Sequence, residues 1–301
     1  MLVACSGGPD SLALAAATVF VAPRLGLRTG LVTVDHQLQP GSGESAGEVA
    51  AWARQSGFAP VMAVAVEVAG RPGGPEAAAR EARYEALVGA AQRVGASAVL
   101  LGHTRDDQAE TVLLALARGA GPRGLAAMPA RRTVDGVLFL RPLLDVPRAD
   151  THAACVALKL EPWHDPHNGS PDYARSRVRA VLPALVDALG PGVVSNLART
   201  AALLADDVEL LDGLASAVDA GDGSSLSVAA LEGLPAALRT RVLHGWARDL
   251  GVSGSALAAR HVAALDALVT AWHGQGPVSL PGGVQVARHA GRLSVVRPMS
   301  M

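Results

Sequence analysis

The sequence is poor in cysteine and nearly free of lysine. It has two cysteines in 301 residues, Cys5 and Cys155, so it offers neither a disulfide framework nor a four-cysteine zinc site. This cysteine usage predicts a reducing, cytoplasmic setting. Of 26 basic residues all but Lys159 are arginine. Arginine suits bidentate phosphate contacts, but the abundant alanine and glycine indicate a biased coding composition equally well.

Long apolar runs and a strong net charge are also absent. No run of 18 apolar residues occurs, so no membrane span is expected. No basic leader precedes the apolar start, so no signal peptide is expected. A net charge of −1 does not by itself indicate a nucleic-acid binder. The length and the 50% hydrophobic content favour two domains with buried cores.

The most informative stretch is the glycine loop, Ser6-Gly7-Gly8-Pro9-Asp10-Ser11. An apolar strand is predicted before it, at 2–5, and an alanine-rich helix after it. Paired glycines let the backbone approach a ligand, and the helix start offers unpaired N–H groups. We therefore predict a phosphate site, with a ligand-free glycine turn as the alternative.

This loop lacks the lysine of the common phosphate loop. It has an acid instead, Asp10, which would suit Mg²⁺ held against pyrophosphate. The pattern S-G-G-x-D-S resembles the pyrophosphate-loop ATPases, a superfamily that cleaves ATP between its α- and β-phosphates.

The rest of the first half alternates strands and helices. Strands are predicted at 31–34, 61–68, 98–101 and 137–140, with helices at 44–56 and 76–94. The alternation predicts an α/β fold with a doubly wound parallel sheet. Because ligands bind at the carboxyl ends of such strands, His36 and Gly102 are predicted to line the nucleotide site.

Two groups of polar residues accompany this sheet. Arg80 and Arg83 share one helix face and would reach the triphosphate, or simply form a solvated face. His103, Asp107 and Glu110 lie just past the fourth strand, where they could hold a metal or orient a nucleophile. Capping of the following helix is the alternative interpretation, but it would explain only Asp106 and not the whole set.

Between residues 118 and 148 there are six arginines and two acids, a stretch that would suit either a phosphate-rich partner such as RNA or a solvated loop. The G-x-G-x-x-G at 119–124 follows a helix and is not a dinucleotide site. His164 and His167 lack a third zinc ligand. A helix begins with Arg175, Arg177 and Arg179.

The last third is predicted to be mostly helical, at 193–218, 229–250 and 255–272, with a β-hairpin at 286–296. We predict a catalytic domain at 1–190, a linker helix at 191–220 and a small domain at 221–301.

These motifs in this order resemble the tRNA(Ile)-lysidine synthetase family over about the first 190 residues. The residues that carry the resemblance are 6–11, 80–84, 102–111, 117–125, 141–144, 163–166 and 175–179, and more weakly 280–283. Thr104 stands where the family often has a second histidine, and Ser176 where asparagine is usual.

The resemblance implies a reaction in which ATP adenylates the C2 oxygen of the wobble cytidine in CAU-anticodon tRNA(Ile). The amine of L-lysine then displaces AMP to give lysidine. It implies that residues Ser6 to Ser11 hold phosphates with Asp10 near Mg²⁺, and that Arg83 and Arg80 neutralise charge on pyrophosphate. His103 and Asp107 would lie between nucleotide and cytidine, and Glu110 or Asp165 would hold lysine. Contacts to tRNA would come from Arg118, Arg123, Arg175, Arg177 and Arg179.

Two alternatives remain from the residues themselves. A tRNA thiolase of the same superfamily would need paired or cluster-binding cysteines, which this sequence lacks. A non-catalytic nucleotide sensor would have no use for His103 with Asp107. The oligomeric state is open between a monomer and a homodimer.

Overall fold

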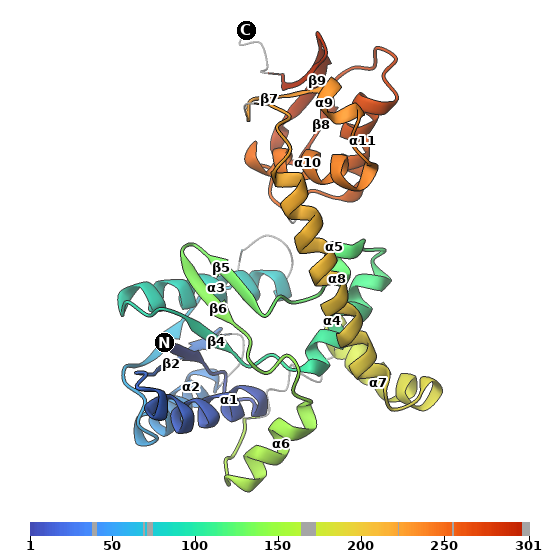
Figure 1. The fold of residues 1–301 in the computed structure, drawn as a ribbon. Coiled ribbons are helices and arrows are strands. Elements are labelled where there is room, and N and C mark those ends of the chain that lie inside the picture. Colours follow the sequence, from blue (N-terminus) through green and yellow to red (C-terminus); the bar gives the residue numbers. More distant parts are fainter. Residues whose placement is uncertain are drawn as a thin grey trace. The chain divides into compact units, whose positions relative to one another are not determined.

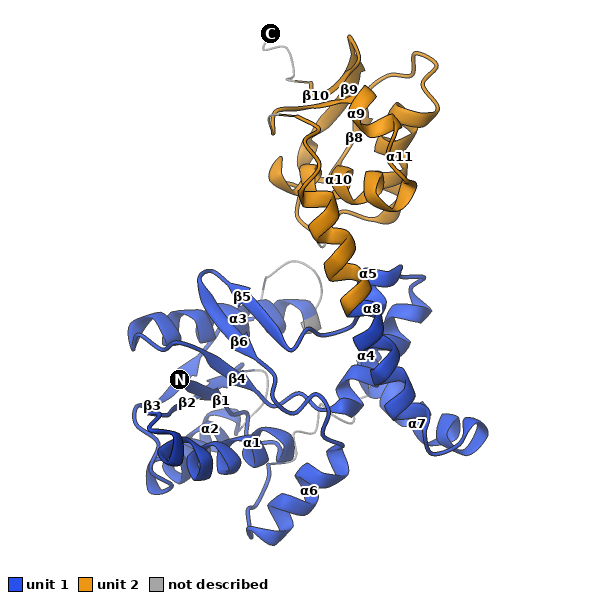
Figure 2. Cartoon of the chain, in the orientation of Figure 1, with its two compact units in different colours: residues 1–205 blue, residues 206–301 orange. Residues whose placement is uncertain are grey.

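The chain forms two compact units, Met1–Ala205 and Asp206–Met301 (Figures 1 and 2). The computed structural model describes residues 1–37, 41–68, 70, 75–163, 173–221, 223–254 and 256–296. The division falls inside helix α8 (Val193–Ser216). The domain limits expected at 190 and 220 stay predictions.

Unit 1 is built on a six-stranded sheet with the order β3-β2-β1-β4-β6-β5. Every neighbouring pair is parallel except β5 with β6. The strands are β1 (Leu2–Ala4), β2 (Gly30–Asp35), β3 (Val61–Ala65), β4 (Val99–Leu101), β5 (Arg131–Val134) and β6 (Val137–Leu140). Short, buried, apolar strands such as β1 and β4 are typical of a parallel sheet covered on both faces.

Helices cover both faces of this sheet, as predicted for a doubly wound fold. One face packs on α1 (Pro9–Val21), α2 (Ser42–Gln55) and α6 (Arg148–Ala157), which share a buried cluster with β1. The other face packs on α3 (Pro75–Arg93) through Tyr84 and Leu87. Unit 1 also holds η1 (Ala22–Leu25), α4 (Arg105–Ala117), α5 (Pro122–Leu125) and α7 (Ala174–Leu189).

Two expectations from the sequence were wrong in detail. Strand β5 was not predicted, because its sequence Arg-Arg-Thr-Val is polar; it pairs antiparallel at the sheet edge, where solvated side chains are tolerated. The helix expected at 229–250 is two helices, α9 (Val228–Glu232) and α10 (Ala236–Asp249). Pro235 caps α10, and its fixed φ and missing N–H separate the two.

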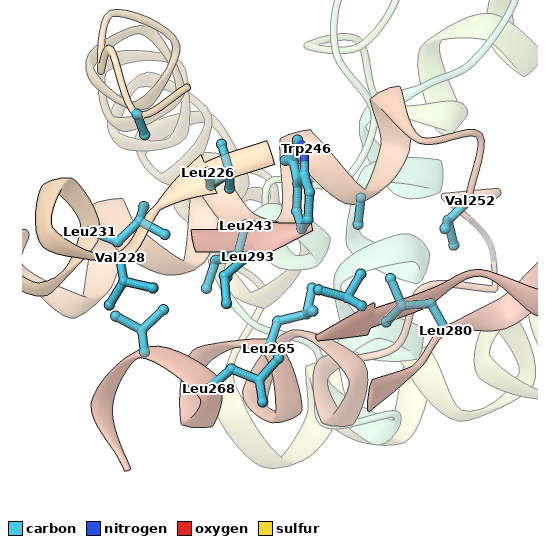
Figure 3. Packing of buried hydrophobic residues seen from close by; sticks show 14 of the residues in the cluster. Leu226, Val228, Leu231, Leu243, Trp246, Val252, Leu265, Leu268, Leu280 and Leu293 are labelled. Carbon is cyan, nitrogen blue, oxygen red and sulfur yellow. The ribbon is translucent and has the colours of Figure 1, made fainter. Parts of the chain in front are cut away.

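Unit 2 has its own hydrophobic core. A four-stranded antiparallel sheet, β7-β10-β9-β8, lies against α9, α10 and α11 (Ala259–Thr270). Figure 3 shows Leu243, Trp246, Leu265 and Leu293 packing together between the sheet and the helices. The predicted hairpin is confirmed as β9 (Gln285–His289) with β10 (Arg292–Val295), while β7 (Ser225–Ser227) and β8 (Val278–Ser279) complete the sheet.

Among the described residues, no single helix is long and apolar enough to cross a membrane. Helices α7 and α8 meet the length and composition criteria only as a pair, and they are bent by 103° where they join.

Candidate active site

A cleft of about 560 Å³ opens in unit 1 at the carboxyl ends of β1, β2 and β4. The strand order reverses between β1 and β4, which is where doubly wound sheets bind ligands. Of the residues predicted to form the site, the cleft is lined by Ser6, Gly8, Pro9, Asp10, Ser11, His36, Arg83, Gly102, His103, Asp107, Arg175 and Arg179. The lining does not include Gly7, Arg80, Glu110, Arg118, Arg123 or Arg177.

The glycine loop joins β1 to α1 in the conformation that its sequence predicts. Gly7 has a φ of +85°, and a Cβ there would lie 2.9 Å from Val49 Cγ2. Ser11 shapes the loop, because its hydroxyl donates to the Gly8 carbonyl at 2.9 Å and accepts the Ser6 N–H at 3.2 Å. The N-terminus of α1 then presents its N–H groups at the cleft, as a phosphate site requires.

Gly102 brings the fourth strand against this loop. A Cβ at Gly102 would lie 2.9 Å from Ser11 Cα and 3.0 Å from the Asp10 carbonyl oxygen. Both neighbours are backbone atoms, so no side chain would fit at position 102. The glycine therefore permits the close approach that puts His103 beside the phosphate loop.

His103 lies in a positive, poorly solvated position. Its Nδ1 is buried and has no hydrogen-bond partner among the described residues. Burial, and then the charge of Arg83, lower the pKa of His103 to about 3, against an opposing effect of Asp107. The imidazole is therefore neutral at physiological pH, with one ring nitrogen available to a ligand.

Asp107 is both a cleft residue and the third residue of the capping box of α4, whose N-cap is Thr104. Its Oδ2 accepts the Thr104 N–H at 2.8 Å and the Thr104 hydroxyl at 3.0 Å. The prediction that Asp106 caps this helix was wrong, since its Oδ2 instead accepts the backbone N–H of Arg148 at 2.8 Å. Burial opposes ionisation of Asp107, but Arg148 and the Thr104 N–H outweigh it and hold the pKa below its usual value. Thr104 thus positions the carboxylate.

Arg148, at the start of α6, connects three acids. Its Nη2 lies 2.9 Å from Asp107 Oδ1, its Nη1 lies 2.9 Å from Glu110 Oε1, and its Nε lies 3.6 Å from Asp10 Oδ2. Sequence reasoning counted Arg148 only within the basic stretch. The available signal was its position at the start of the helix that follows the last parallel strand, because the carboxyl ends of such strands face the ligand crevice.

Glu110 is wholly buried and surrounded by arginines. Arg179 reaches Oε1 at 2.8 Å and Oε2 at 3.2 Å, and Arg175 lies 3.7 Å from Oε2, in addition to the Arg148 contact. Both carboxylate oxygens are occupied, so a lysine ammonium would have to displace a guanidinium. The predicted lysine contact at Asp165 lies outside the described residues.

Asp10 is the acid nearest the phosphate loop. Burial raises its pKa, while a hydrogen bond from Thr151 and the charge of Arg148 act in the opposite sense. Mg²⁺ is usually held by one or two carboxylates together with substrate phosphates. A single carboxylate beside a phosphate-binding turn fits that donor set.

Arg83 is the cation that faces the cleft without a counter-ion among the described residues. Its Nε–H is buried and donates to no described residue, and burial together with the nearby Arg80 charge lowers the pKa of Arg83 to about 10. It remains protonated near neutral pH. An uncompensated, partly desolvated guanidinium of this kind favours an anionic ligand.

Comparison with known proteins agrees with this geometry. Residues 1–185 match the model of the PP-loop domain, and residues 226–294 match that of the TilS substrate binding domain. The tRNA(Ile)-lysidine synthase of Salinispora tropica is 65% identical over 303 residues, which cover 99% of this chain and 91% of the relative. The chain belongs to the tRNA(Ile)-lysidine synthase family. The enzyme of that name from Thermobifida fusca is 57% identical, over 98% of this chain and 91% of its own length.

The fold of unit 1 also occurs outside the lysidine synthases. A U34-tRNA thiolase from Methanococcus maripaludis, solved with its [4Fe-4S] cluster, covers 67% of this chain and 70% of its own at a TM-score of 0.56. At 18% identity this similarity concerns the fold alone. Both cysteines of this chain are buried, burial raises the pKa of each thiol, and no group of three metal-ligating side chains occurs in the described part of the chain. A thiolase chemistry is therefore not favoured.

Proposed function

We propose that this protein ligates L-lysine to C2 of the wobble cytidine in CAU-anticodon tRNA(Ile), using ATP. The observation that carries the proposal is that His103 and Asp107 line the same cleft as the glycine loop, in a chain whose two family matches cover both units. The cytidine C2 oxygen attacks the α-phosphorus, and pyrophosphate leaves. The lysine amine then attacks C2, and AMP leaves.

Different residues of the cleft would serve different steps of this reaction. The glycine loop and the N-terminus of α1 bind the phosphates, with Arg83 and Arg80 neutralising charge as pyrophosphate departs. Asp10 would hold Mg²⁺, which when bound would polarise the phosphates. Neutral His103 accepts or donates one hydrogen bond between nucleotide and base. His36 and Gly102 border the nucleotide on the neighbouring strands.

Lysine binding is proposed at Glu110, with Asp165 as the second candidate. The arginines that contact Glu110 would make this position selective for a cation. Only a positively charged ligand can replace one of them without leaving the buried Glu110 carboxylate uncompensated. For tRNA, exposed Arg118 and Arg123 follow α4, and Arg177 is exposed on α7. Arg175 and Arg179 line the cleft nearby. A cytoplasmic location and a homodimer remain predictions.

The test is pyrophosphate release with ATP, Mg²⁺ and lysine, with and without a transcript of CAU-anticodon tRNA(Ile), followed by incorporation of labelled lysine. We expect both signals to require the RNA and to fall at least about a hundredfold in Asp107→Asn, a substitution that keeps an acceptor for the Thr104 cap. Asp150→Asn, which changes an exposed acid on α6, serves as the control.

Other results would reject parts of the proposal. Pyrophosphate release without lysine incorporation would remove lysine as the substrate but keep the ATPase. ATP binding without pyrophosphate release, under any RNA, would indicate a nucleotide sensor.

A further inference from the structure

Four arginines surround the ring of Tyr84 on the α3 side of the sheet. The Cζ atoms of Arg80, Arg83 and Arg132 lie 5.3, 5.8 and 5.7 Å from the ring centroid. Arg141 donates from Nη2 to the Tyr84 hydroxyl at 2.9 Å. We call this group the arginine–tyrosine cluster.

The cluster has an excess of positive charge. The guanidinium of Arg141 has hydrogen-bond partners in the protein, the Tyr84 hydroxyl and the Pro129 carbonyl. Arg80, Arg83 and Arg132 have no hydrogen bond or ion pair with any described residue beyond their contacts with the ring. Burial would raise the pKa of Tyr84, but the surrounding arginines hold it below its usual value. Like charges gathered in this way are stabilised by an anion.

The members of the cluster differ in their access to the cleft. Arg83 lines it, whereas Arg80 and Arg132 do not. Arg132 is exposed on the edge strand β5, at the same end of the sheet as the cleft, because β5 runs antiparallel to β6. The cluster therefore continues the positive charge from the nucleotide site out to an open edge of unit 1.

The strand register explains why Arg132, and not its neighbour, joins the cluster. Arg132 is paired with Phe139, whose ring packs on Tyr84 at 5.1 Å between centroids. Arg131 is paired with Leu140, which packs on the opposite face with the α1 cluster. Directly paired residues share a face and successive residues alternate.

We infer that the outer side of the arginine–tyrosine cluster, at Arg132, binds a backbone phosphate of the RNA substrate. A triphosphate is short and would reach from the glycine loop to Arg83 and Arg80, whereas a polynucleotide carries a phosphate at every residue and can extend outward to Arg132. The ring of Tyr84 fixes the guanidinium groups by cation–π contact. This inference rests on the proposed function, since it assumes that the reactive base enters the cleft.

The test compares Arg132→Ala with Arg131→Ala, which removes the same charge from the other face. Binding of the tRNA(Ile) transcript is measured against salt concentration, and ATP affinity is measured in parallel. For Arg132→Ala we expect roughly three- to tenfold weaker RNA binding, a salt slope smaller by about 0.7 to 0.9, and unchanged ATP affinity. Arg131→Ala should change the RNA affinity less than about twofold.

Equal losses in the two variants would overturn the inference, since only the overall charge of the edge would then matter. So would a loss of ATP affinity in Arg132→Ala without a change in the RNA slope, which would assign the cluster to the outer phosphates of ATP. Lysine incorporation by the unsubstituted protein is measured separately. If it is absent while Arg132→Ala alone alters the RNA slope, the RNA contact stands and the proposed function fails.

Discussion

At the scale of single residues, the cleft depends on one arginine that neutralises three acids. Arg148 contacts Asp10, Asp107 and the wholly buried Glu110. Removing one partner from a buried ion cluster leaves the opposite charges uncompensated, which costs far more than the cluster itself contributes.

Arg148→Met should therefore lower the free energy of unfolding of unit 1 by about 3 kcal/mol. Arg54→Met, on the exposed surface of α2, should change it by less than about 0.5 kcal/mol. Urea unfolding followed by circular dichroism measures both. Equal stabilities of the two variants would show that the acids do not depend on Arg148.

His103 should give unit 1 a characteristic dependence on pH. Its pKa is lowered to about 3 in the folded chain, so protonation favours the unfolded chain. The resulting stability is fully present above pH 6.5 and is lost as pH falls towards 3, by about 1.4 kcal/mol per unit. His103→Gln should flatten this decline in a series of melting temperatures, whereas His289→Gln, an exposed site in unit 2, should not. Parallel profiles for wild type and His103→Gln would contradict the assignment.

At the scale of elements, the approach of β4 to the glycine loop positions the chemistry. The loop conformation is local, but its distance from His103 depends on the missing side chain at Gly102. The carboxyl end of β4 therefore controls the geometry of the phosphate site.

Gly102→Ala should weaken ATP binding by roughly tenfold or more and destabilise unit 1 by about 1–3 kcal/mol, because its Cβ would push against backbone. Gly89→Ala, at an exposed position of α3 with open space around it, should instead stabilise by up to about 1 kcal/mol. Isothermal titration with ATP and thermal unfolding check both substitutions. Normal ATP affinity in Gly102→Ala would mean that the loop does not depend on this approach.

At the scale of the whole molecule, each unit has a separate core and should unfold in its own transition. Trp246 is almost fully buried in unit 2, and its indole N–H donates to the Gly223 carbonyl at 2.9 Å. Trp246→Ala should lower the stability of unit 2 by about 3–5 kcal/mol.

Calorimetry should then show one transition shifted down and a second, the one that ATP raises, unchanged. Lysine incorporation should fall at the temperature where unit 2 unfolds, while ATP binding persists. A single transition that moves as a whole would show that the units unfold together.

The sequence by itself determined the glycine loop, the alternation of strands and helices, and the residues gathered at strand ends. These follow from local rules: periodicity, helix starts and the freedom of glycine. Only the tertiary structure decided that Arg148 neutralises Asp10, Asp107 and Glu110, and that Arg132 faces Tyr84. Those contacts join residues up to 138 positions apart, as for Arg148 and Asp10. No local pattern encodes such pairs, because each depends on strand order and register, which the packing of the whole sheet sets.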